Sequence, residues 1–313
     1  MDETRWAFVF PGQGSQKIGM GRDWAEGSAA AREVFEEADD VLGFGLTRLC
    51  WEGPEDELAL TANLQPALLT TSVAILRAAA EELPTPVAVA GHSLGEYSAL
   101  VAAGVLTFAD ALRLVRRRGE LMQAAVPVGQ GAMAAILGMD DAAVDALVAA
   151  AAEGDVLAVA NRNAPGQLVL AGATAAVERA LERARAEGGK PKLLPVSAPF
   201  HCPLMAPARE GLAPMLAATA FADPRVPVVV NVNAMPVTSG AAARNALERQ
   251  IDGTVRWIES VVVLTDDLGA TGILEVGPGA VLQGLVKRIR PDVRRCGLAE
   301  PSGLGALRPQ PTT

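Results

Sequence analysis

Short apolar runs and longer amphipathic segments alternate along most of the chain. The first run, residues 6–10, predicts a buried strand that leads into the glycine-rich turn PGQGSQ. Apolar positions then recur with helical spacing around 28–42 and 64–83, and the run VAVA at 87–90 predicts a second buried strand. Strands that alternate with helices indicate a mostly parallel sheet covered on both faces, so the predicted fold class is α/β.

A different pattern begins near Pro127. Apolar runs predict strands and amphipathic segments predict helices, in the order β-α-β-β-α-β, at 131–138, 141–152, 156–161, 167–172, 175–188 and 192–197. This order is typical of a ferredoxin-like domain. We therefore expect a small domain over 127–197, inserted into a larger α/β domain that consists of residues 1–126 and 198–300.

The α/β pattern resumes after the insert. Strands are predicted at 227–232 and 273–276, and the second of them leads through Gly277-Pro278-Gly279 into a helix at 280–289. The tail from Pro301 is rich in proline, glycine and serine, so residues 301–313 are predicted to form a flexible tail.

Composition narrows the classes of function. The 313 residues are half hydrophobic and carry 27 basic against 36 acidic side chains, a net charge of −9. This charge argues against nucleic acid or an anionic membrane as the main partner, although it leaves room for a local basic patch. No apolar run approaches the roughly 18 residues that span a bilayer. The acidic start MDETR is unlike a secretory signal, and we expect a cytoplasmic, monomeric protein.

Cysteine and histidine are scarce. Cys50, Cys202 and Cys296 are odd in number and far apart, so they indicate neither a disulfide framework nor a zinc site. The only histidines are His92 and His201. A metal bound by His201 and Cys202 would lack a second pair of ligands, and we expect no metal.

Ser93 stands between two glycines directly after the second predicted strand, in the stretch VAVAGHSLGEYSAL. Gly91 to Gly95 match G-x-S-x-G, in which a strand turns sharply into a helix and exposes the serine hydroxyl near backbone N–H groups. The alternative is an ordinary serine at a helix start. The strand before it and the helix after it favour a nucleophile, and Glu96 suits the positive end of that helix's dipole.

A serine hydroxyl needs a general base to act as a nucleophile at neutral pH. His92 is adjacent in sequence, and neighbours around a sharp turn point apart, which leaves His201. His201 lies in SAPFHCPLM, just past the last strand of the insert, where it can overhang a cleft between the domains. The alternative is a loop histidine at a domain boundary. A G-x-S-x-G turn that otherwise lacks a base favours the catalytic interpretation.

A third segment, TFADALRLVRRRGELMQAAV, predicts an amphipathic helix capped by Thr107 and Asp110. Arg116 and its charged neighbours fall on a solvated face, but Arg118 falls on the apolar stripe. A buried arginine cannot lose its charge and must meet an anion. That anion is either a protein carboxylate in a buried salt bridge or a substrate carboxylate bound bidentately, and the sequence leaves both open.

Seven stretches, taken in order, resemble the malonyl-CoA:acyl-carrier-protein transacylases of bacterial type II fatty-acid synthesis. They are FVFPGQGSQ, QPALL, GHSLGEYSALVAAGV, RRGELMQ, NRNAPGQ, PVSAPFH and EVGPG, and they cover the chain from about residue 5 to 300. The resemblance implies an α/β-hydrolase-like core with a mostly parallel sheet and a ferredoxin-like insert. It also implies that a coenzyme A thioester is a substrate and that no cofactor is bound, because the phosphopantetheine is carried by the partner.

The resemblance implies roles for individual residues. Ser93 would take the malonyl group from malonyl-CoA and pass it to the phosphopantetheine thiol of holo acyl carrier protein. His201 would be the base and later the acid, oriented by the backbone carbonyl of Gln250. The backbone N–H groups of Gln13 and Leu94 would form the oxyanion hole.

Further residues are implied in substrate binding. Arg118 would bind the malonyl carboxylate, and Phe200 would help to exclude α-branched acyl groups. Gln65 and Asn163 match positions that line the site. The chain departs from the family pattern at Arg162, which adds a charge near the cleft where relatives usually have an aromatic residue.

An acidic enzyme that receives an acidic carrier protein needs a local basic patch. The densest basic set lies in and just after the last predicted helix and comprises Lys287, Arg288, Arg290, Arg294 and Arg295. It is either a docking site for the carrier protein or a solvated helix end favoured by the helix dipole.

Three other functions remain open. The same fold can serve a polyketide pathway as a free-standing acyltransferase, with the same motifs. A hydrolase, such as an acyl-thioesterase, can use the same serine turn, but an apolar acyl pocket has no use for Arg118. A non-catalytic module that binds carrier protein is disfavoured because nucleophile, base and anion site are all present.

Overall fold

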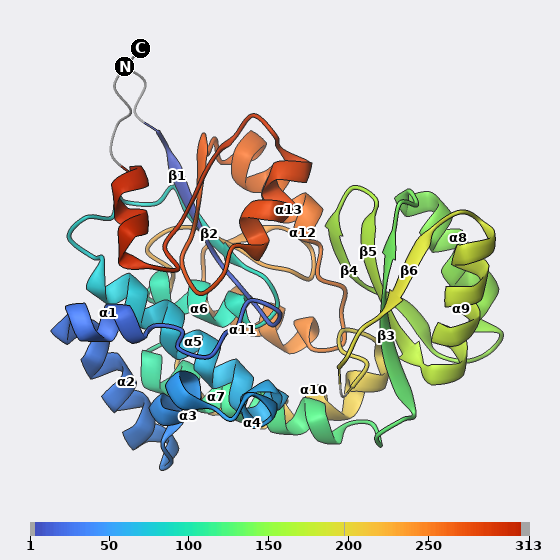
Figure 1. The fold of residues 1–313 in the computed structure, drawn as a ribbon, viewed down its shortest axis with the longest axis horizontal. Helices are drawn as coiled ribbons and strands as arrows, with labels where there is room; N and C mark the ends of the chain where they lie inside the picture. The colour runs from blue at the N-terminus through green and yellow to red at the C-terminus, as the bar shows by residue number, and fades with distance from the viewer. Residues whose placement is uncertain (1–3, 197, 308–313) are drawn as a thin grey trace.

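Two β-sheets organise the chain, whose structure is a computed structural model that describes residues 4–196 and 198–307 (Figure 1). The strands of the larger, six-stranded sheet are, in spatial order, β10 (Arg294–Gly297), β9 (Gly272–Glu275), β1 (Trp6–Phe10), β2 (Ala88–Gly91), β7 (Val228–Val229) and β8 (Pro236–Val237). Neighbouring strands pair in parallel, except for the antiparallel pair of β7 and β8. The predicted mixed α/β fold with a mainly parallel sheet is confirmed.

Helices cover both faces of this sheet because its central strand is apolar on both sides. Phe8 and Phe10 of β1 pack in one core with three helices, α5 (Thr61–Ala78), α6 (Gly95–Ala102) and α7 (Phe108–Ala124). Ala7 and Val9, which point the other way, pack in a second core with α12 (Trp257–Val262) and α13 (Val281–Ile289). Burial of each large side chain contributes roughly 1.5–3 kcal/mol.

The remaining helices of this part lie outside those layers. They are α1 (Arg22–Gly27), α2 (Ala29–Leu42), α3 (Leu46–Glu52), α4 (Glu55–Ala59), α10 (Ala206–Ala218) and α11 (Gly240–Gln250). Helix α2 packs on α5 and α7, while α10 packs between α7 and α11. In the described part of the chain, no helix is both long and apolar enough to cross a membrane.

The second sheet is antiparallel, and all its strands fall inside the predicted insert. Its spatial order is β4 (Leu157–Ala164), β5 (Gln167–Ala173), β3 (Gly131–Leu137) and β6 (Lys190–Leu193). Helices α8 (Asp141–Ala152) and α9 (Thr174–Ala186) cover its outer face (Figure 1). Along β5, Leu168 and Leu170 pack toward these helices, whereas Val169 joins the core of the larger part. The inner face of the small sheet therefore packs against the larger part of the molecule.

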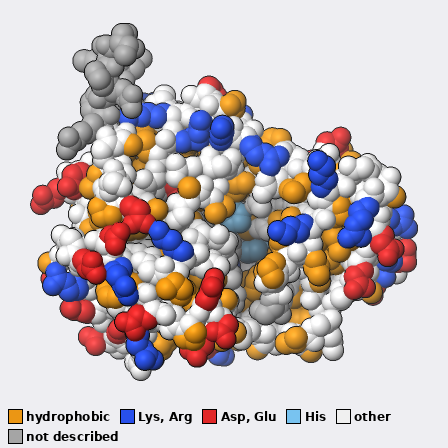
Figure 2. Space-filling view, viewed as in Figure 1, with side chains coloured by type: hydrophobic (Ala, Val, Ile, Leu, Met, Phe, Trp, Pro, Cys, Tyr) orange, Lys and Arg blue, Asp and Glu red, His pale blue; other side chains and the backbone are white. Residues whose placement is uncertain are grey.

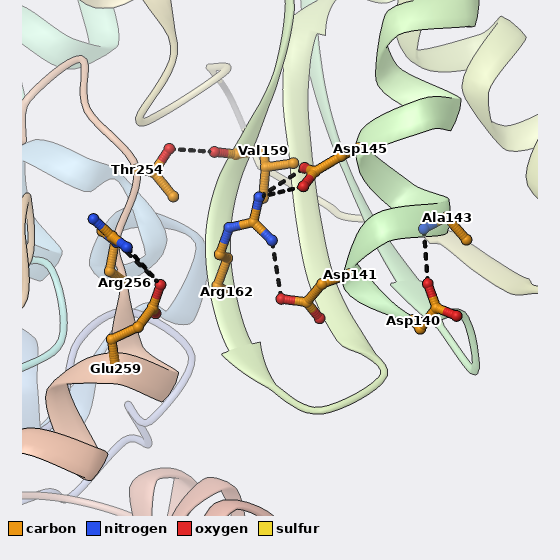
Figure 3. A network of polar contacts seen from close by, with 9 residues as sticks. All are labelled: Asp140, Asp141, Ala143, Asp145, Val159, Arg162, Thr254, Arg256 and Glu259. Atoms are coloured by element: carbon orange, nitrogen blue, oxygen red, sulfur yellow. Dashed lines mark hydrogen bonds and ion pairs between the residues drawn. The ribbon is translucent and has the colours of Figure 1, made fainter.

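The two parts are joined by backbone hydrogen bonds as well as by packing. Asn161 of β4 forms an isolated parallel bridge with Val255, in the segment that follows α11. The Val255 N–H donates to the carbonyl of Ala160 at 2.9 Å, and the Thr254 hydroxyl donates to the carbonyl of Val159 at 2.7 Å (Figure 3). These bonds fix the small sheet against the residues that follow Gln250.

Several predicted boundaries need correction. The strand expected at 192–197 is β6, which lies at Lys190–Leu193, and residue 197 is outside the described residues. The strand expected at 227–232 shrinks to Val228–Val229, because the Val230 N–H already donates to the carbonyl of Met235 in a turn toward β8. Strands β8 and β10 do not correspond to any predicted strand.

The flexible tail expected at 301–313 is wrong for its first half. Pro301–Leu307 form a 3₁₀ helix, and Leu304 and Leu307 pack against the larger core. The Arg294 side chain also donates to the carbonyl of Ala306 at 2.6 Å. Apolar contacts thus order a segment whose composition indicated disorder, and residues 308–313 are outside the described residues.

Candidate active site

Ser93 sits on a sharp turn between β2 and α6, with a positive φ of 52°. The flanking glycines are required by close packing. A Cβ on Gly91 would lie 1.9 Å from the carbonyl group of Gly95, and a Cβ on Gly95 would lie 2.0 Å from the carbonyl oxygen of Phe10. The turn therefore has the geometry of a strained strand-to-helix elbow, a geometry that can expose a nucleophilic side chain, and it is not an ordinary helix start.

His201 is the histidine that meets Ser93. The distance from Ser93 Oγ to His201 Nε2 is 2.7 Å, and His201 Nδ1 lies 2.9 Å from the backbone carbonyl of Gln250. Since Nδ1 must donate its proton to that carbonyl, Nε2 is free to accept the proton of the serine hydroxyl. Burial, and next the charge of Arg118, lowers the pKa of His201 to about 3, so the imidazole is neutral at physiological pH.

His92 points away from the hydroxyl, as predicted for a neighbour across a sharp turn. Its Nε2 donates to Asn163 Oδ1 at 2.8 Å, and its ring packs edge-on against Trp257 with centroids 5.5 Å apart. The structure thereby places Asn163, from β4, beside the elbow.

Arg118 projects from α7 toward the nucleophile and is only 1% exposed. Its Nη1 donates to Gln65 Oε1 at 2.7 Å, while its Nη2 donates to Gln250 Oε1 at 2.9 Å and to Ser93 Oγ at 3.2 Å. In the described part of the chain, no carboxylate lies within ion-pair distance of this guanidinium. The direct buried salt bridge, one of the two alternatives left by the sequence, is absent there.

Gln65 is fully buried behind Arg118. Besides accepting from the guanidinium, its amide nitrogen faces the sulfur of Met122 at 3.8 Å. It therefore supports the arginine and does not line the cavity over Ser93.

Two polar residues at the elbow are not among the predicted site residues. Asn231 accepts from the Ser93 N–H and donates to the carbonyl of Gly91, both at 2.7 Å, so it clamps the two sides of the turn. Glu96 is fully buried, although its place in the first turn of α6 had suggested only an interaction with the helix dipole. The only sequence signals were a polar residue ending the run PVVVN and a carboxylate within an otherwise apolar helix.

A cavity of about 180 Å³ opens over Ser93 between the two parts of the molecule. Gln13, Phe200 and His201 line it from the larger part, and Met133 and Asn163 line it from the small sheet. Figure 2 shows histidine atoms near the centre of the visible face, in a hollow between the two halves. The turn that carries Gln13 reaches the elbow closely, because a Cβ on Gly12 would lie 2.4 Å from the carbonyl oxygen of His92.

Arg162 does not bring a free charge to this cavity. Its guanidinium donates to Asp141 at 2.9 Å and to Asp145 at 2.7 Å, both on α8 (Figure 3). The added arginine thus ties β4 to α8 and points away from Ser93.

The predicted basic set is divided among different tasks. Arg288, on α13, donates to the carbonyl of Pro165 at 2.7 Å, in the turn between β4 and β5. Arg290 is paired with Asp266. Arg294 and Arg295 belong to strand β10 and donate to backbone carbonyls, including that of Pro291 at 3.0 Å for Arg295. The five basic residues therefore do not form a single patch of unpaired positive charges.

Comparison with known proteins places these features in a family. The model of the acyl transferase domain matches residues 7–300. The malonyl CoA-acyl carrier protein transacylase of Escherichia coli strain K12 is 50% identical over 305 residues, which cover 97% of this chain and 98% of that protein. The enzyme of the same name from Bacillus subtilis strain 168 is 48% identical over 300 residues, 95% of this chain and 94% of that protein.

Solved structures of similar proteins superimpose on nearly the whole chain. A crystal structure of an acyl carrier protein S-malonyltransferase from Vibrio cholerae superimposes with a TM-score of 0.95 at 45% identity, covering 97% of this chain and 100% of that one. A malonyl-transacylase solved in complex with a type II polyketide acyl carrier protein gives a TM-score of 0.94 at 46% identity, covering 97% and 99%.

Proposed function

The chain belongs to the acyl transferase domain family, among the malonyl CoA-acyl carrier protein transacylases, and we propose that it moves malonyl groups from malonyl-CoA to holo acyl carrier protein through an acyl-enzyme on Ser93. This proposal rests mainly on the position and contacts of Arg118. Its buried guanidinium touches the nucleophile and is held only by neutral oxygen atoms. Such an arginine lacks a direct anionic partner, and the carboxylate of a malonyl group would supply one.

In the first half of the reaction, Ser93 Oγ attacks the thioester carbonyl while His201 Nε2 takes its proton. The carbon–oxygen bond to the enzyme forms, the carbon–sulfur bond breaks, and the proton passes from Nε2 to the departing thiolate of coenzyme A. Burial disfavours the imidazolium, so the proton stays on His201 only briefly. The second half reverses these steps, with the phosphopantetheine thiol as the nucleophile and Ser93 as the leaving group.

The oxyanion of each tetrahedral intermediate needs hydrogen-bond donors. The Ser93 N–H is committed to Asn231, whereas the next N–H, that of Leu94, lies at the N-terminal end of α6. We assign the oxyanion hole to the backbone N–H groups of Leu94 and Gln13. Close approach of the PGQGSQ turn to the elbow at Gly12 supports the second donor.

Two residues of the cavity wall shape the acyl site. Phe200 is 6% exposed and directly precedes the base, and its ring restricts the space for an α-branched acyl group. Asn163 is oriented by His92 and faces the cavity from the small sheet. We propose that both contact the bound acyl chain or its pantetheine arm.

We further propose that the carrier protein docks where α13 meets the turn between β4 and β5. Lys287 and Arg288 lie there, and Arg288 contacts both halves that border the cavity. We also propose that the small domain is ferredoxin-like and that the larger one has an α/β-hydrolase-like core. The strand order β4-β5-β3-β6 and the strand–elbow–helix arrangement at Ser93 support these assignments. The enzyme would act in the cytoplasm as a monomer without a bound cofactor.

Intact-mass spectrometry tests the proposal. After incubation with malonyl-CoA, the protein should gain one malonyl group, which disappears when holo carrier protein is added and is absent in Ser93→Ala. Rapid loss of the adduct to water would instead indicate a hydrolase, and absence of any adduct would rule out both enzymes. Parallel reactions with fatty-acid and polyketide carrier proteins address the second candidate, a polyketide acyltransferase, which the complexed relative favours.

A further inference from the structure

Glu96 is a buried carboxylate at the centre of the site that the mechanism above does not use. It lies three residues after the nucleophile, in the first turn of α6, and is fully buried. Its Oε2 accepts from the Asn231 N–H at 2.7 Å and from Gln250 Nε2 at 3.1 Å. The other oxygen, Oε1, has no hydrogen-bond partner among the described residues.

Gln250 connects this carboxylate to Arg118. Its amide nitrogen donates to Glu96 and to the carbonyl of Ser93, at 3.1 and 2.9 Å, which leaves its amide oxygen facing Arg118 Nη2 at 2.9 Å. Since the nitrogen end meets only acceptors, the amide has one favourable orientation. Glu96, Gln250 and Arg118 thus form a chain in which a neutral amide separates an anion from a cation.

The charge of Glu96 is the negative charge that acts on Arg118. The Arg118 guanidinium also lies over the Tyr97 ring, 5.7 Å from its centroid, but burial raises the pKa of that phenol to about 12, so it is neutral at physiological pH. Glu96 and Arg118 stabilise each other's charged forms. A substrate carboxylate on Arg118 would be a second anion close to Glu96, and like charges in a buried site repel strongly.

We propose that Glu96 is the internal counter-ion of Arg118 and that it limits how tightly the arginine holds a substrate carboxylate. This inference rests on the proposed function, because it concerns selection of malonyl over uncharged acyl groups. Glu96 is then a specificity-determining residue that acts through Gln250 and touches no substrate. It keeps the unloaded site electrically balanced and prevents the malonyl group from binding too strongly to move on to the carrier protein.

The charge of Glu96 depends on pH. Burial raises the pKa of Glu96 to about 7, and the ionisable groups that face it are Arg118 from α7 and Tyr97 on its own helix. Below pH 7 the carboxyl becomes neutral, and Arg118 then attracts a malonyl carboxylate without competition. Above pH 7 it ionises and competes. The preference for malonyl over acetyl should therefore fall as pH rises through 7, while proton transfer to His201 affects both substrates alike.

Glu96→Gln isolates the charge, because the amide oxygen of glutamine can still accept from Asn231 and Gln250. Acyl-enzyme formation would be followed by quenched-flow and intact mass with malonyl-CoA and acetyl-CoA, at pH 6 and pH 8.5. Glu275→Gln is the matched control. Glu275 is also a fully buried glutamate, but its carboxylate accepts from the N–H groups of Leu282 and Gln283 at the start of α13, outside the site.

The malonyl-to-acetyl ratio of loading rates should rise about tenfold in Glu96→Gln at pH 8.5 and less at pH 6. The ratio in Glu275→Gln should equal that of the unaltered enzyme at both pH values. An unchanged or lower ratio in Glu96→Gln overturns the proposal. If this variant does not fold, the unaltered enzyme decides: a ratio that falls severalfold from pH 6 to 8.5 supports the proposal, and a constant ratio refutes it. Failure of the unaltered enzyme to load malonyl at all would count against the proposed function instead.

Discussion

Arg118 and Arg162 are both predicted to lie near the cleft, yet the structure gives them opposite surroundings. Arg162 is partly exposed and binds two carboxylates, those of Asp141 and Asp145 (Figure 3). Arg118 is 1% exposed and binds only neutral oxygens, from Gln65, Gln250 and Ser93. The more deeply buried cation is thus the one without a direct ion pair.

We interpret this difference as the contrast between a structural arginine and one that binds substrate. An exposed ion pair costs little to form and contributes about 0.2–1 kcal/mol, which suits a tie between β4 and α8. A buried guanidinium is expensive to desolvate and destabilises the fold unless anions compensate it. Its retention next to the nucleophile, with its nearest anion one amide away at Glu96, indicates a site prepared for a charged ligand.

The largest effects are expected when the nucleophile or the base is removed. Ser93→Ala should abolish acyl-enzyme formation, and His201→Ala should slow it by several orders of magnitude without unfolding the protein, because the hydroxyl needs its proton removed during attack. Quenched-flow loading and circular dichroism would measure the two effects. Malonyl loading at the normal rate in His201→Ala would show that another group is the base.

The lowered pKa of His201 predicts how the loading rate and the stability depend on pH. With its pKa lowered to about 3, His201 is neutral from pH 5 upward. The plot of loading rate against pH should therefore show no step near pH 6.5 that is due to His201. Unfolding exposes His201 and restores its ordinary pKa near 6.5, so the unfolded state binds more protons below that value. The contribution of His201 to stability is therefore complete above pH 6.5 and declines as pH falls toward 3.

Arg118→Ala should have the next largest effect. Loss of a charge-assisted, bidentate interaction worth roughly 1.5–3 kcal/mol per hydrogen bond should lower malonyl loading by about two to four orders of magnitude. Acetyl loading should become easier, because acetyl has no carboxylate that could contact the buried Arg118 guanidinium. Arg118→Lys should recover only part, since an ammonium cannot bind both carboxylate oxygens at once. Undiminished malonyl preference in Arg118→Ala would make this arginine structural, like Arg162.

A smaller effect is expected at Lys287, which is a surface cation on α13 and represents a third environment. Lys287→Glu should raise the KM for carrier protein severalfold at low salt and leave malonyl loading from malonyl-CoA unchanged, because rim charges act mainly on association rate. Arg288 is less suitable for this test, since its side chain also holds the turn between β4 and β5. A KM for carrier protein that ignores both the substitution and the salt concentration would place docking elsewhere.

Arg162→Ala should have the smallest effect on catalysis. It should lower the free energy of unfolding by about 1 kcal/mol or less and leave the malonyl-to-acetyl ratio unchanged, because its ion pairs are partly exposed and directed toward α8. Chemical denaturation and the two loading rates check both statements. A changed ratio would mean that Arg162 influences the acyl site after all.

Much of the molecule follows from local sequence alone. The glycines at 91 and 95 specify the elbow because a side chain at either position would collide with backbone. Helix α8 begins and ends where its amphipathic pattern predicts, and the predicted cap of α7 forms with the Asp110 N–H donating to Thr107 at 3.1 Å. Residue scarcity identified His201, since only one histidine could reach the serine.

The tertiary structure alone decided which polar groups surround that nucleophile. Glu96 and Asn231 are 135 residues apart, Arg118 and Gln250 are 132 apart, and nothing in either local pattern encodes their contact. The order of strands brings β2 beside β7, and Asn231 comes to face the elbow because it follows β7 at that edge. Helical periodicity could show that Arg118 points inward. Only the tertiary arrangement, which brings Gln65 of α5 and Gln250 of α11 to Arg118 of α7, could show that this arginine meets amides and not a carboxylate. Burial allows a charge only where the whole set of surrounding groups satisfies it.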